Sequence, residues 1–271
     1  MHDHADARPK VDYDRLATSY DRRYAGDFAP GVGEALADIS SQLGARRALE
    51  AGCGTAYWLA GLPGSTVLRC GLDLSAGMLS KALARDPRLQ LAQGRASRLP
   101  FSAGSFDLVY CINALHHFHR PEAFLHEARR ILRPGGGLVV VGLDPRRFLY
   151  SDQRGSAQSA WYIYEYFPGT LETDLERYPS VGVILDWLVA AGFSQATWHP
   201  VALVRETLLG EAILDDPFLQ QEATSQLTLL SESAYKAGLA RIQQALSESA
   251  AAGEEIGFAV DLILEMIIAL I

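Results

Sequence analysis

The chain has 271 residues, of which 49% are hydrophobic and 21% are charged, and this ordinary globular composition excludes global disorder. The formal net charge of −8 argues against nucleic acid as the main partner, because phosphate binding needs clustered Lys and Arg. The length suffices for one large domain or for a domain that carries an insertion.

The three cysteines, Cys53, Cys70 and Cys111, lie far apart in apolar stretches. A disulfide framework or a cysteine-based metal site is therefore not expected. The first ten residues, MHDHADARPK, contain no apolar run and predict no secretory signal. The most apolar segment, 256–271, is too short for an ordinary membrane span and carries two carboxylates. We expect a cytoplasmic protein without a membrane segment.

The N-terminal part of the chain, residues 1–45, is predicted to form a helical cap. It contains a short helix with tyrosines over 11–24 and an amphipathic helix over 31–44. Strands and helices then alternate. Strands are predicted over 45–52, 65–74, 89–94, 105–115 and 136–144, and helices over 54–62, 75–86 and 120–133, with Ser75 as an N-cap. This repeat is typical of a parallel sheet covered by helices on both faces.

The alternation of strands and helices ends after Asp144. The aromatic-rich connection over 145–180 that follows is interpreted as a substrate lid. A helix is predicted over 180–192, a strand over 193–208 that is bulged or broken at Pro200, and a last strand over 256–271. Residues 211–252 form a helical insertion between these two strands, and its clearest helix runs from Ser231 to Ser247. This insertion either packs on the sheet without a further role, or forms a cap or a homodimer surface. Residues 46–271 thus make up the main domain.

The segment ALEAGCGTAYWLAGL, residues 48–62, runs from an apolar strand into a glycine turn. Gly52 and Gly54 fit the first two positions of the dinucleotide fingerprint G-x-G-x-x-G, but Tyr57 holds the third. A bulky ring there obstructs the close helix–strand approach that a pyrophosphate site needs, which disfavours a nucleotide-dependent oxidoreductase. Asp73 ends the next strand, where a carboxylate can bind both hydroxyls of a ribose.

Four motifs follow in order, AGCGTA, CGLDLS, GRASRLPFSAGSFDLVYCINALHHF and ARRILRPGGGLVVV. Together they closely resemble the class I S-adenosylmethionine-dependent methyltransferases, in particular the small-molecule branch with the pattern LPF-x4-FD-x-V. The resemblance covers about residues 10–145 and extends weakly to the C-terminus. We expect an α/β fold with a Rossmann-like seven-stranded mixed sheet, mainly parallel with the last strand antiparallel, flanked by helices.

The resemblance implies S-adenosylmethionine as cofactor, S-adenosylhomocysteine as product, and the following site residues. The methionine part would be lined by Glu50, Gly52, Cys53 and Gly54, and Tyr20 would close over its end. Asp73 would bind the ribose, and Asn113 would lie under the cofactor. The adenine would pack on Leu74 and Met78, and its edge would meet Ala96 beside Arg95. Many relatives have Gly-Asp-Ala where this chain has Gly94-Arg95-Ala96. Arginine cannot accept the hydrogen bond of the adenine amino group, so we expect a loss of about 0.5–1.5 kcal/mol at this contact.

The histidines of HHFH, residues 116–119, lack the further ligands of a zinc set, so no metal is expected. His117 is a candidate to orient or deprotonate a substrate, with Tyr20 as the second catalytic candidate; alternatively, one histidine packs and the others are solvated. Asp107 is interpreted as structural.

The aromatic run WYIYEYF follows in the predicted lid. Trp161, Tyr162, Tyr164 and Tyr166 are expected to line a substrate pocket, with ordinary core as the alternative.

The implied reaction is an in-line displacement that moves a methyl group from a sulfonium to a small-molecule acceptor, for which the protein supplies alignment and dry surroundings. The chain contains no NPPY-like stretch, which many amino methyltransferases acting on nucleobases or glutamine amides carry. With the acidic charge, this favours a small molecule over nucleic acid. The alternative is a protein of the same fold that binds the sulfonium but does other chemistry or none.

Overall fold

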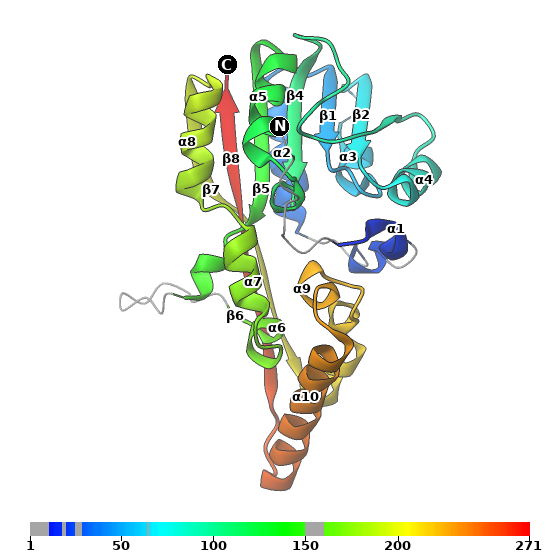
Figure 1. The fold of residues 1–271 in the computed structure, drawn as a ribbon, viewed down its shortest axis with the longest axis vertical. Coiled ribbons are helices and arrows are strands. Elements are labelled where there is room, and N and C mark those ends of the chain that lie inside the picture. The colour runs from blue at the N-terminus through cyan, green and yellow to red at the C-terminus, as the bar shows by residue number, and fades with distance from the viewer. Residues whose placement is uncertain (1–10, 18–19, 25–28, 64, 150–159) are drawn as a thin grey trace, which may run out of the picture.

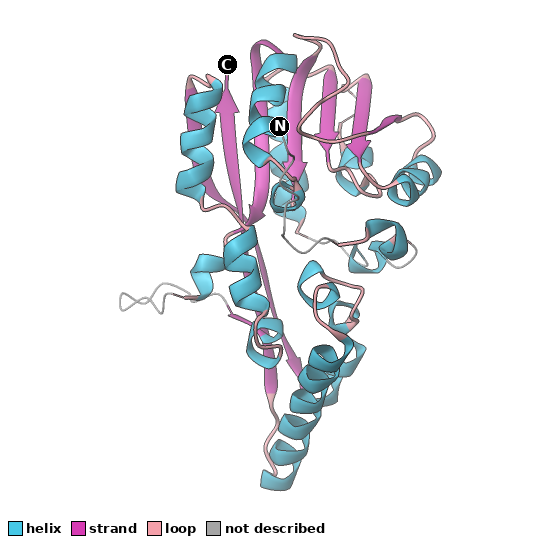
Figure 2. Ribbon diagram, viewed as in Figure 1, coloured by secondary structure: helices cyan, strands magenta, loops and turns pink. Residues whose placement is uncertain are grey.

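The computed structural model describes residues 11–17, 20–24, 29–63, 65–149 and 160–271. Its strands form one sheet, shown in Figure 1 and in magenta in Figure 2. The strands are β1 Arg47–Ala51, β2 Leu68–Asp73, β3 Gln90–Gln93, β4 Phe106–Ile112, β5 Leu132–Leu143, β6 Ala160–Trp161, β7 Gln195–Leu209 and β8 Gly257–Leu270.

The described part of the sheet has the order β3-β2-β1-β4-β5-β8-β6, with β7 also paired to β8. Strands β1 to β5 are parallel to their neighbours, whereas β8 is antiparallel to β5, β6 and β7. This confirms the α/β class and the mainly parallel sheet with an antiparallel last strand. Within the described residues the sheet has eight strands instead of the expected seven, because the two-residue strand β6 adds to β8 at Val260 and Asp261.

Helices cover both faces of the sheet (Figure 1). The α-helices are α1 Tyr13–Leu16, α2 Pro30–Gln42, α3 Tyr57–Gly61, α4 Ala76–Arg85, α5 Pro121–Ile131, α6 Tyr162–Tyr166, α7 Thr170–Arg177, α8 Val181–Ala191, α9 Ser225–Thr228 and α10 Glu232–Ala252. The 3-10 helices are η1 Tyr20–Tyr24, η2 Leu115–His117, η3 Pro145–Phe148, η4 Gly210–Asp215 and η5 Pro217–Leu219.

The core follows from the two-residue period of the strands, because neighbouring side chains point to opposite faces of a sheet. Leu49 and Val109 belong to the cluster that packs against α5 and α8. Their neighbours Ala48 and Leu108 belong to the cluster that packs against α2 and α3. β1 and β4 are therefore buried on both sides, as their near-continuous apolar runs in the sequence predict.

Strands β7 and β8 form a long ribbon that continues beyond the rest of the sheet (Figure 1). β5 pairs only with the C-terminal half of β8, from Leu264 to Leu270. Around the remaining half lie α6, η4, α9 and α10, whose apolar side chains form a third core cluster with Phe258 of β8. The expected irregularity at Pro200 is a bulge between Pro200 and Ala202.

Several boundaries differ from the sequence-based expectations. β5 begins at Leu132, directly after α5, and not at residue 136, because Leu132 already pairs with Phe106 before the register shifts. The described residues of the expected helix over 11–24 form two short helices, α1 and η1. Parts of the predicted cap (1–10, 18–19 and 25–28) and of the predicted lid (150–159) lie outside the described residues.

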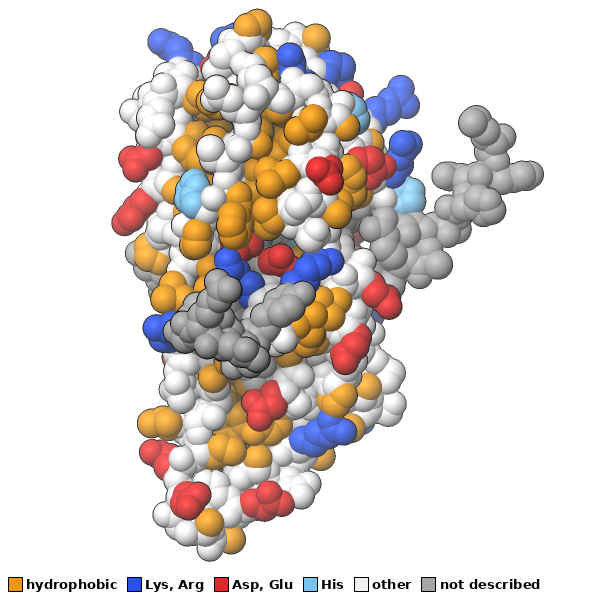
Figure 3. Space-filling model, turned by 90° about the vertical axis from the view of Figure 1, so that its left-hand side faces the viewer, with side chains coloured by type: hydrophobic (Ala, Val, Ile, Leu, Met, Phe, Trp, Pro, Cys, Tyr) orange, Lys and Arg blue, Asp and Glu red, His pale blue; other side chains and the backbone are white. Residues whose placement is uncertain are grey.

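Apolar side chains gather on the face that α8 and β7 form (Figure 3), where Val183, Val189 and Trp198 are exposed. None of the helices in the described ranges has both the length and the apolar composition needed to cross a membrane.

Candidate active site

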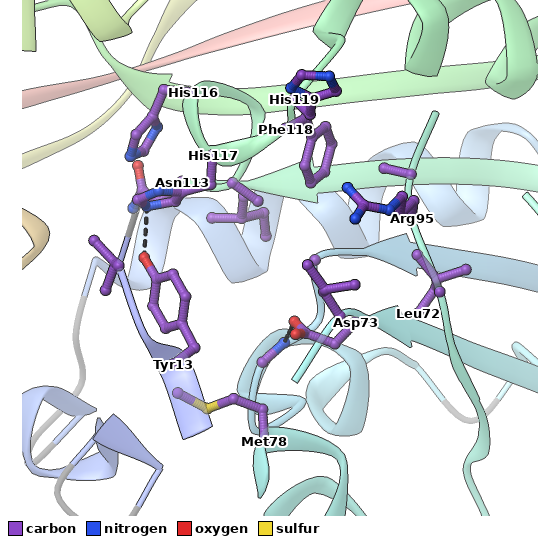
Figure 4. Close-up of a pocket in the computed structure, with 18 of the residues that line it drawn as sticks. Tyr13, Leu72, Asp73, Met78, Arg95, Asn113, His116, His117, Phe118 and His119 are labelled. Carbon is purple, nitrogen blue, oxygen red and sulfur yellow. Dashed lines mark hydrogen bonds between the residues drawn. The ribbon is translucent and has the colours of Figure 1, made fainter. Parts of the chain in front are cut away.

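A cavity of about 310 Å³ lies beyond the carboxyl ends of β1, β2 and β4 (Figure 4). Ligands of parallel α/β sheets collect at this edge, because the turns that follow the strands leave a crevice there. Most of the sequence-predicted cofactor residues line this cavity: Gly52, Gly54, Asp73, Leu74, Met78, Arg95, Ala96 and Asn113. Tyr20 and His117 line it as well.

The glycine turn after β1 forms one wall. Gly52 has φ 71° and Gly54 has φ 50°, values that side-chain-bearing residues rarely adopt. A Cβ on Gly52 would lie 2.7 Å from the Cβ of Ala114, in the segment that leads into η2. Glycine at position 52 therefore lets the turn pack directly against that segment, and the backbone itself forms the floor of the cavity.

Asp73 ends β2 and closes the turn. Its carboxylate accepts hydrogen bonds from the amide of Gly54 at 2.8 Å and from the amide of Ser75 at 2.9 Å. Burial raises the pKa of the Asp73 carboxyl above its usual value, while these two amides oppose the shift. A carboxylate offers about four acceptor positions, so Asp73 retains capacity for hydroxyl donors in the cavity.

Glu50 and Cys53, which the resemblance assigns to the cofactor, lie outside the described lining of the cavity. The Glu50 side chain is 2% exposed and accepts a hydrogen bond from the hydroxyl of Tyr110 at 3.4 Å. Burial raises the pKa of the Glu50 carboxyl well above its usual value. Cys53 is buried, and its Sγ would lie 2.7 Å from a Cβ on Gly71 of β2. Both residues support the turn from behind.

His117 lies between two partners that sequence reasoning missed. Its Nε2 is 2.6 Å from the hydroxyl oxygen of Tyr13 (Figure 4). Its Nδ1 is 3.1 Å from Nη2 of Arg177. A guanidinium can only donate, so Nδ1 of His117 is the acceptor. The proton of the neutral ring therefore sits on Nε2, which donates to the oxygen of Tyr13.

Arg177 belongs to a buried network that connects this site to the helical part of the molecule. It pairs with Asp174 at 3.1 Å, and their side chains are 4% and 0% exposed. Asp174 also accepts hydrogen bonds from the hydroxyl of Tyr164 at 2.7 Å and from the amide of Gln226 in α9 at 2.5 Å. Burial raises the pKa of the Asp174 carboxyl, although these donors oppose the shift.

A second cavity of about 630 Å³ adjoins the first, and the two share Tyr20, Asn113 and His117 among other lining residues. It extends toward the β7–β8 ribbon and α9. We call the first the cofactor-side cavity and the second the ribbon-side cavity.

Only Trp161 of the four aromatic residues expected to line a substrate pocket borders the described ribbon-side cavity. The hydroxyl of Tyr162 donates to Asp216 at 2.6 Å, and Tyr164 holds Asp174. Tyr166 packs against Phe258 with ring centroids 5.2 Å apart. The consecutive aromatics split because α6 turns successive side chains by about 100°, so they cannot share one face.

Sequence reasoning missed Tyr13, Phe118 and Arg177, which also line the cofactor-side cavity. The segment YDRLATSYD contains Tyr13 as well as the predicted site residue Tyr20, so the sequence offered a signal for Tyr13. Nothing in the local sequence marks Arg177, which lies 60 positions from His117. The described residues contain no group of three His, Cys, Asp or Glu that could hold a metal ion.

Comparisons with known proteins point in one direction. A family model described as a methyltransferase domain matches residues 49–140. A demethylmenaquinone methyltransferase from Mycolicibacterium vanbaalenii is 39% identical over 168 residues, which span 56% of this chain and 70% of that protein. The chain spans only about half the length of several other curated relatives that it matches, with shares of 58%, 42% and 52%.

Solved structures show the same fold. A protein of Anabaena variabilis, ascribed to methyl transfer in an antibiotic biosynthesis pathway, superposes with a TM-score of 0.65 at 21% identity, covering 90% of this chain and 98% of that one. Phosphoethanolamine N-methyltransferase 2 of Haemonchus contortus, in complex with S-adenosylmethionine, gives a TM-score of 0.54 at 19% identity, covering 95% of this chain and 57% of that one.

Proposed function

Because this chain belongs to the class I S-adenosylmethionine-dependent methyltransferases, we propose that it transfers the methyl group of S-adenosylmethionine to a small-molecule acceptor. The observation that carries the proposal is the cofactor-side cavity, in which the glycine turn, Asp73 and Met78 meet at one edge of the sheet. When bound, the cofactor supplies a methyl group that its sulfonium already activates. The chain's residues bind, align and exclude water.

The residues of the cofactor-side cavity suit this cofactor. Asp73 has acceptor capacity for the two ribose hydroxyls, and Met78 is a buried apolar side chain beside it for the adenine. Leu74 and the backbone of Ala96 complete this wall, and Arg95 is exposed at its rim. The backbone of Gly52 and Gly54 leaves room for the methionine part. Glu50 and Cys53 act on the cofactor only through the turn that they support.

His117 acts in this proposal as an orienting residue. Its Nδ1 is occupied by Arg177 and its Nε2 proton is directed to Tyr13, so neither nitrogen is placed to take a proton from an acceptor. Tyr13 and Tyr20 lie at the junction of the two cavities, where their rings exclude water from the methyl group. A base is needed only for a poorly acidic acceptor.

The acceptor enters through the ribbon-side cavity, which Trp161 and the β7–β8 ribbon border. The acidic surface and the cavity of about 630 Å³ favour a small molecule over nucleic acid. Three buried free thiols, Cys53, Cys70 and Cys111, suit the reducing cytoplasm. In this proposal the described parts of 11–45 act as a cap, the described parts of 145–180 act as a lid, and 211–252 is a helical insertion that borders the acceptor or a second copy in a homodimer.

The test is isothermal titration calorimetry with S-adenosylmethionine and S-adenosylhomocysteine. We expect both to bind the wild type with a dissociation constant in the micromolar range. Asp73→Ala should weaken binding at least about tenfold, because a hydrogen bond to a charged group contributes about 1.5–3 kcal/mol and about 1.4 kcal/mol corresponds to a factor of ten. Asp38→Ala, which removes an exposed carboxylate from α2, is the matched control and should bind like the wild type.

Absence of binding to the wild type would refute the proposal. If the cofactor binds, time-dependent formation of S-adenosylhomocysteine with candidate acceptors separates methyl transfer from the alternative. Binding without product formation across the acceptor classes would favour a protein that uses the cofactor for other chemistry or only binds it.

A further inference from the structure

We propose that the ribbon-side cavity selects an acceptor that is largely apolar and carries an ammonium group, which Glu206 binds. This inference rests on the proposed function, since it takes the ribbon-side cavity as the acceptor site. It is carried by the alternation of side chains on one face of the β7–β8 ribbon and by the charged and aromatic residues that line the cavity.

The apolar part of the cavity is provided by the ribbon. Val204 and Leu208 of β7 alternate with Glu206 and therefore share its face of the sheet. On β8, Val260 is the direct partner of Glu206 and Leu262 is the direct partner of Val204. All five side chains line the cavity. The ribbon thus presents an apolar wall with one carboxylate in it.

That carboxylate has no counter-charge within the described residues. The neighbouring pair, Arg205 with Asp261 at 3.0 Å, belongs to the opposite face of the ribbon, because residue 205 is one position away from Glu206. No described basic side chain forms an ion pair with Glu206. Glu206 is exposed to solvent, so its carboxylate is accessible to a cation that enters the cavity.

The other charged side chains that line the cavity are also negative. Asp215 and Asp216 border the cavity, and none of its described lining residues is Lys or Arg. Asp216 is engaged by the hydroxyl of Tyr162 at 2.6 Å and by the amide of Phe218 at 2.9 Å, which leaves Glu206 and Asp215 for a ligand. Burial is the main cause that raises the pKa of the Tyr162 hydroxyl, and the negative charges of Asp216 and Glu206 raise this pKa further. Both carboxylates therefore act on the same side chain.

The other end of the cavity reaches the site of methyl transfer. Tyr13, Tyr20 and His117 line both cavities, and Trp58 adds an aromatic surface on the ribbon side. An acceptor held by its ammonium group at Glu206 and packed along the ribbon would present its other end to the methyl group. An anionic acceptor of the same shape would meet only negative charge on this path.

The experiment uses three probes of matched shape, phenylhexylamine, phenylhexanol and phenylhexanoate, titrated by calorimetry into the full chain saturated with S-adenosylhomocysteine. We expect the amine to bind at least about tenfold more tightly than the alcohol, and the carboxylate to bind most weakly. Glu206→Gln should remove the preference for the amine and leave binding of the alcohol unchanged. Asp215→Asn should reduce the preference in part.

The matched control is Glu211→Gln, which removes an exposed carboxylate of η4 that is not in the cavity lining. It should behave like the wild type. Equal binding of amine and alcohol, tighter binding of the carboxylate, an unchanged preference in Glu206→Gln, or no probe binding would each overturn the inference. Binding of S-adenosylhomocysteine, measured first on each protein, reports separately on folding and on the proposed function.

Discussion

Single side chains decide what the candidate site can do chemically. Arg177 can only donate hydrogen bonds, and this one fact fixes the proton of His117 on Nε2 and directs it to Tyr13. Glu50, which the resemblance assigns to the cofactor, has a side chain that is 2% exposed and accepts a hydrogen bond from Tyr110. In both cases the hydrogen-bond partner of the side chain, and not only the residue type, determines what that side chain can bind.

The buried carboxyl of Glu50 should make the stability of the chain depend on pH. Burial raises its pKa in the folded state, so the unfolded chain, with a carboxyl pKa of about 4.3, ionises first as the pH rises. The free energy of unfolding should therefore fall as the pH rises from about 4 through the folded pKa. Glu50→Gln removes this loss and should be more stable at neutral pH by about 1 kcal/mol or more.

Urea unfolding at several pH values between about 4 and 7 measures this difference, which should shrink to near zero at the acidic end. Glu34→Gln, at an exposed position of α2, serves as the control and should show no pH-dependent difference. A wild type that is more stable than Glu50→Gln at neutral pH would contradict the prediction.

Elements hold their places through local signals and close packing. The predicted N-cap Ser75 accepts a hydrogen bond from the amide of Met78 at 3.0 Å and starts α4, and Asp107 ties the amides of Arg46 and Arg47 at the start of β1. The long helix α10 is placed differently, by contact with the ring of Phe167 in the third core cluster. Local sequence predicts where such a helix begins, but not what it packs against.

Gly238 allows the close approach of α10. A Cβ there would lie 2.1 Å from Cδ1 of the fully buried Phe167. Overpacking costs about 1–3 kcal/mol, whereas alanine gains about 1 kcal/mol of helix propensity. We expect Gly238→Ala to lower the free energy of urea unfolding by about 1–2 kcal/mol, because the buried ring has little room to move.

Gly182→Ala in α8 is the control, since the nearest atom to its Cβ would be 4.0 Å away. It should be neutral or slightly stabilising. If both variants gain stability, the contact between α10 and Phe167 is not as close as described.

At the scale of the whole molecule, the β7–β8 ribbon and the buried network around Asp174 connect the sheet to the helical part. The ribbon pairs with β5 at one end and packs against α6, η4 and α10 at the other. The network runs from Gln226 in α9 through Asp174 and Arg177 to His117, next to the cofactor-side cavity. The ribbon-side cavity therefore lies between two parts that the ribbon and this network connect.

Asp174→Asn should break this connection. The substitution leaves the guanidinium of Arg177 buried without a counter-charge and replaces one acceptor oxygen with a donor. Removing one partner of a buried ion pair costs about 3–5 kcal/mol, so we expect a loss of about 3 kcal/mol in urea unfolding. Glu172→Gln, on the exposed side of α7, should change stability by less than about 0.5 kcal/mol. A loss of similar size in both variants would argue against the network.

The sequence by itself determined the α/β class and the mainly parallel sheet, because these depend on local patterns, and its resemblance to a known family predicted most of the residues that line the cofactor-side cavity. Apolar periodicity marks strands and helices, the turn at Gly52 and Gly54 requires positive φ, and Asp73 ends a strand whose carboxyl end must face the crevice. Tertiary structure alone decided the partners of His117, which are 104 and 60 positions away. It also decided that Glu206 faces a cavity. Such contacts depend on how distant elements pack, and no local pattern records that.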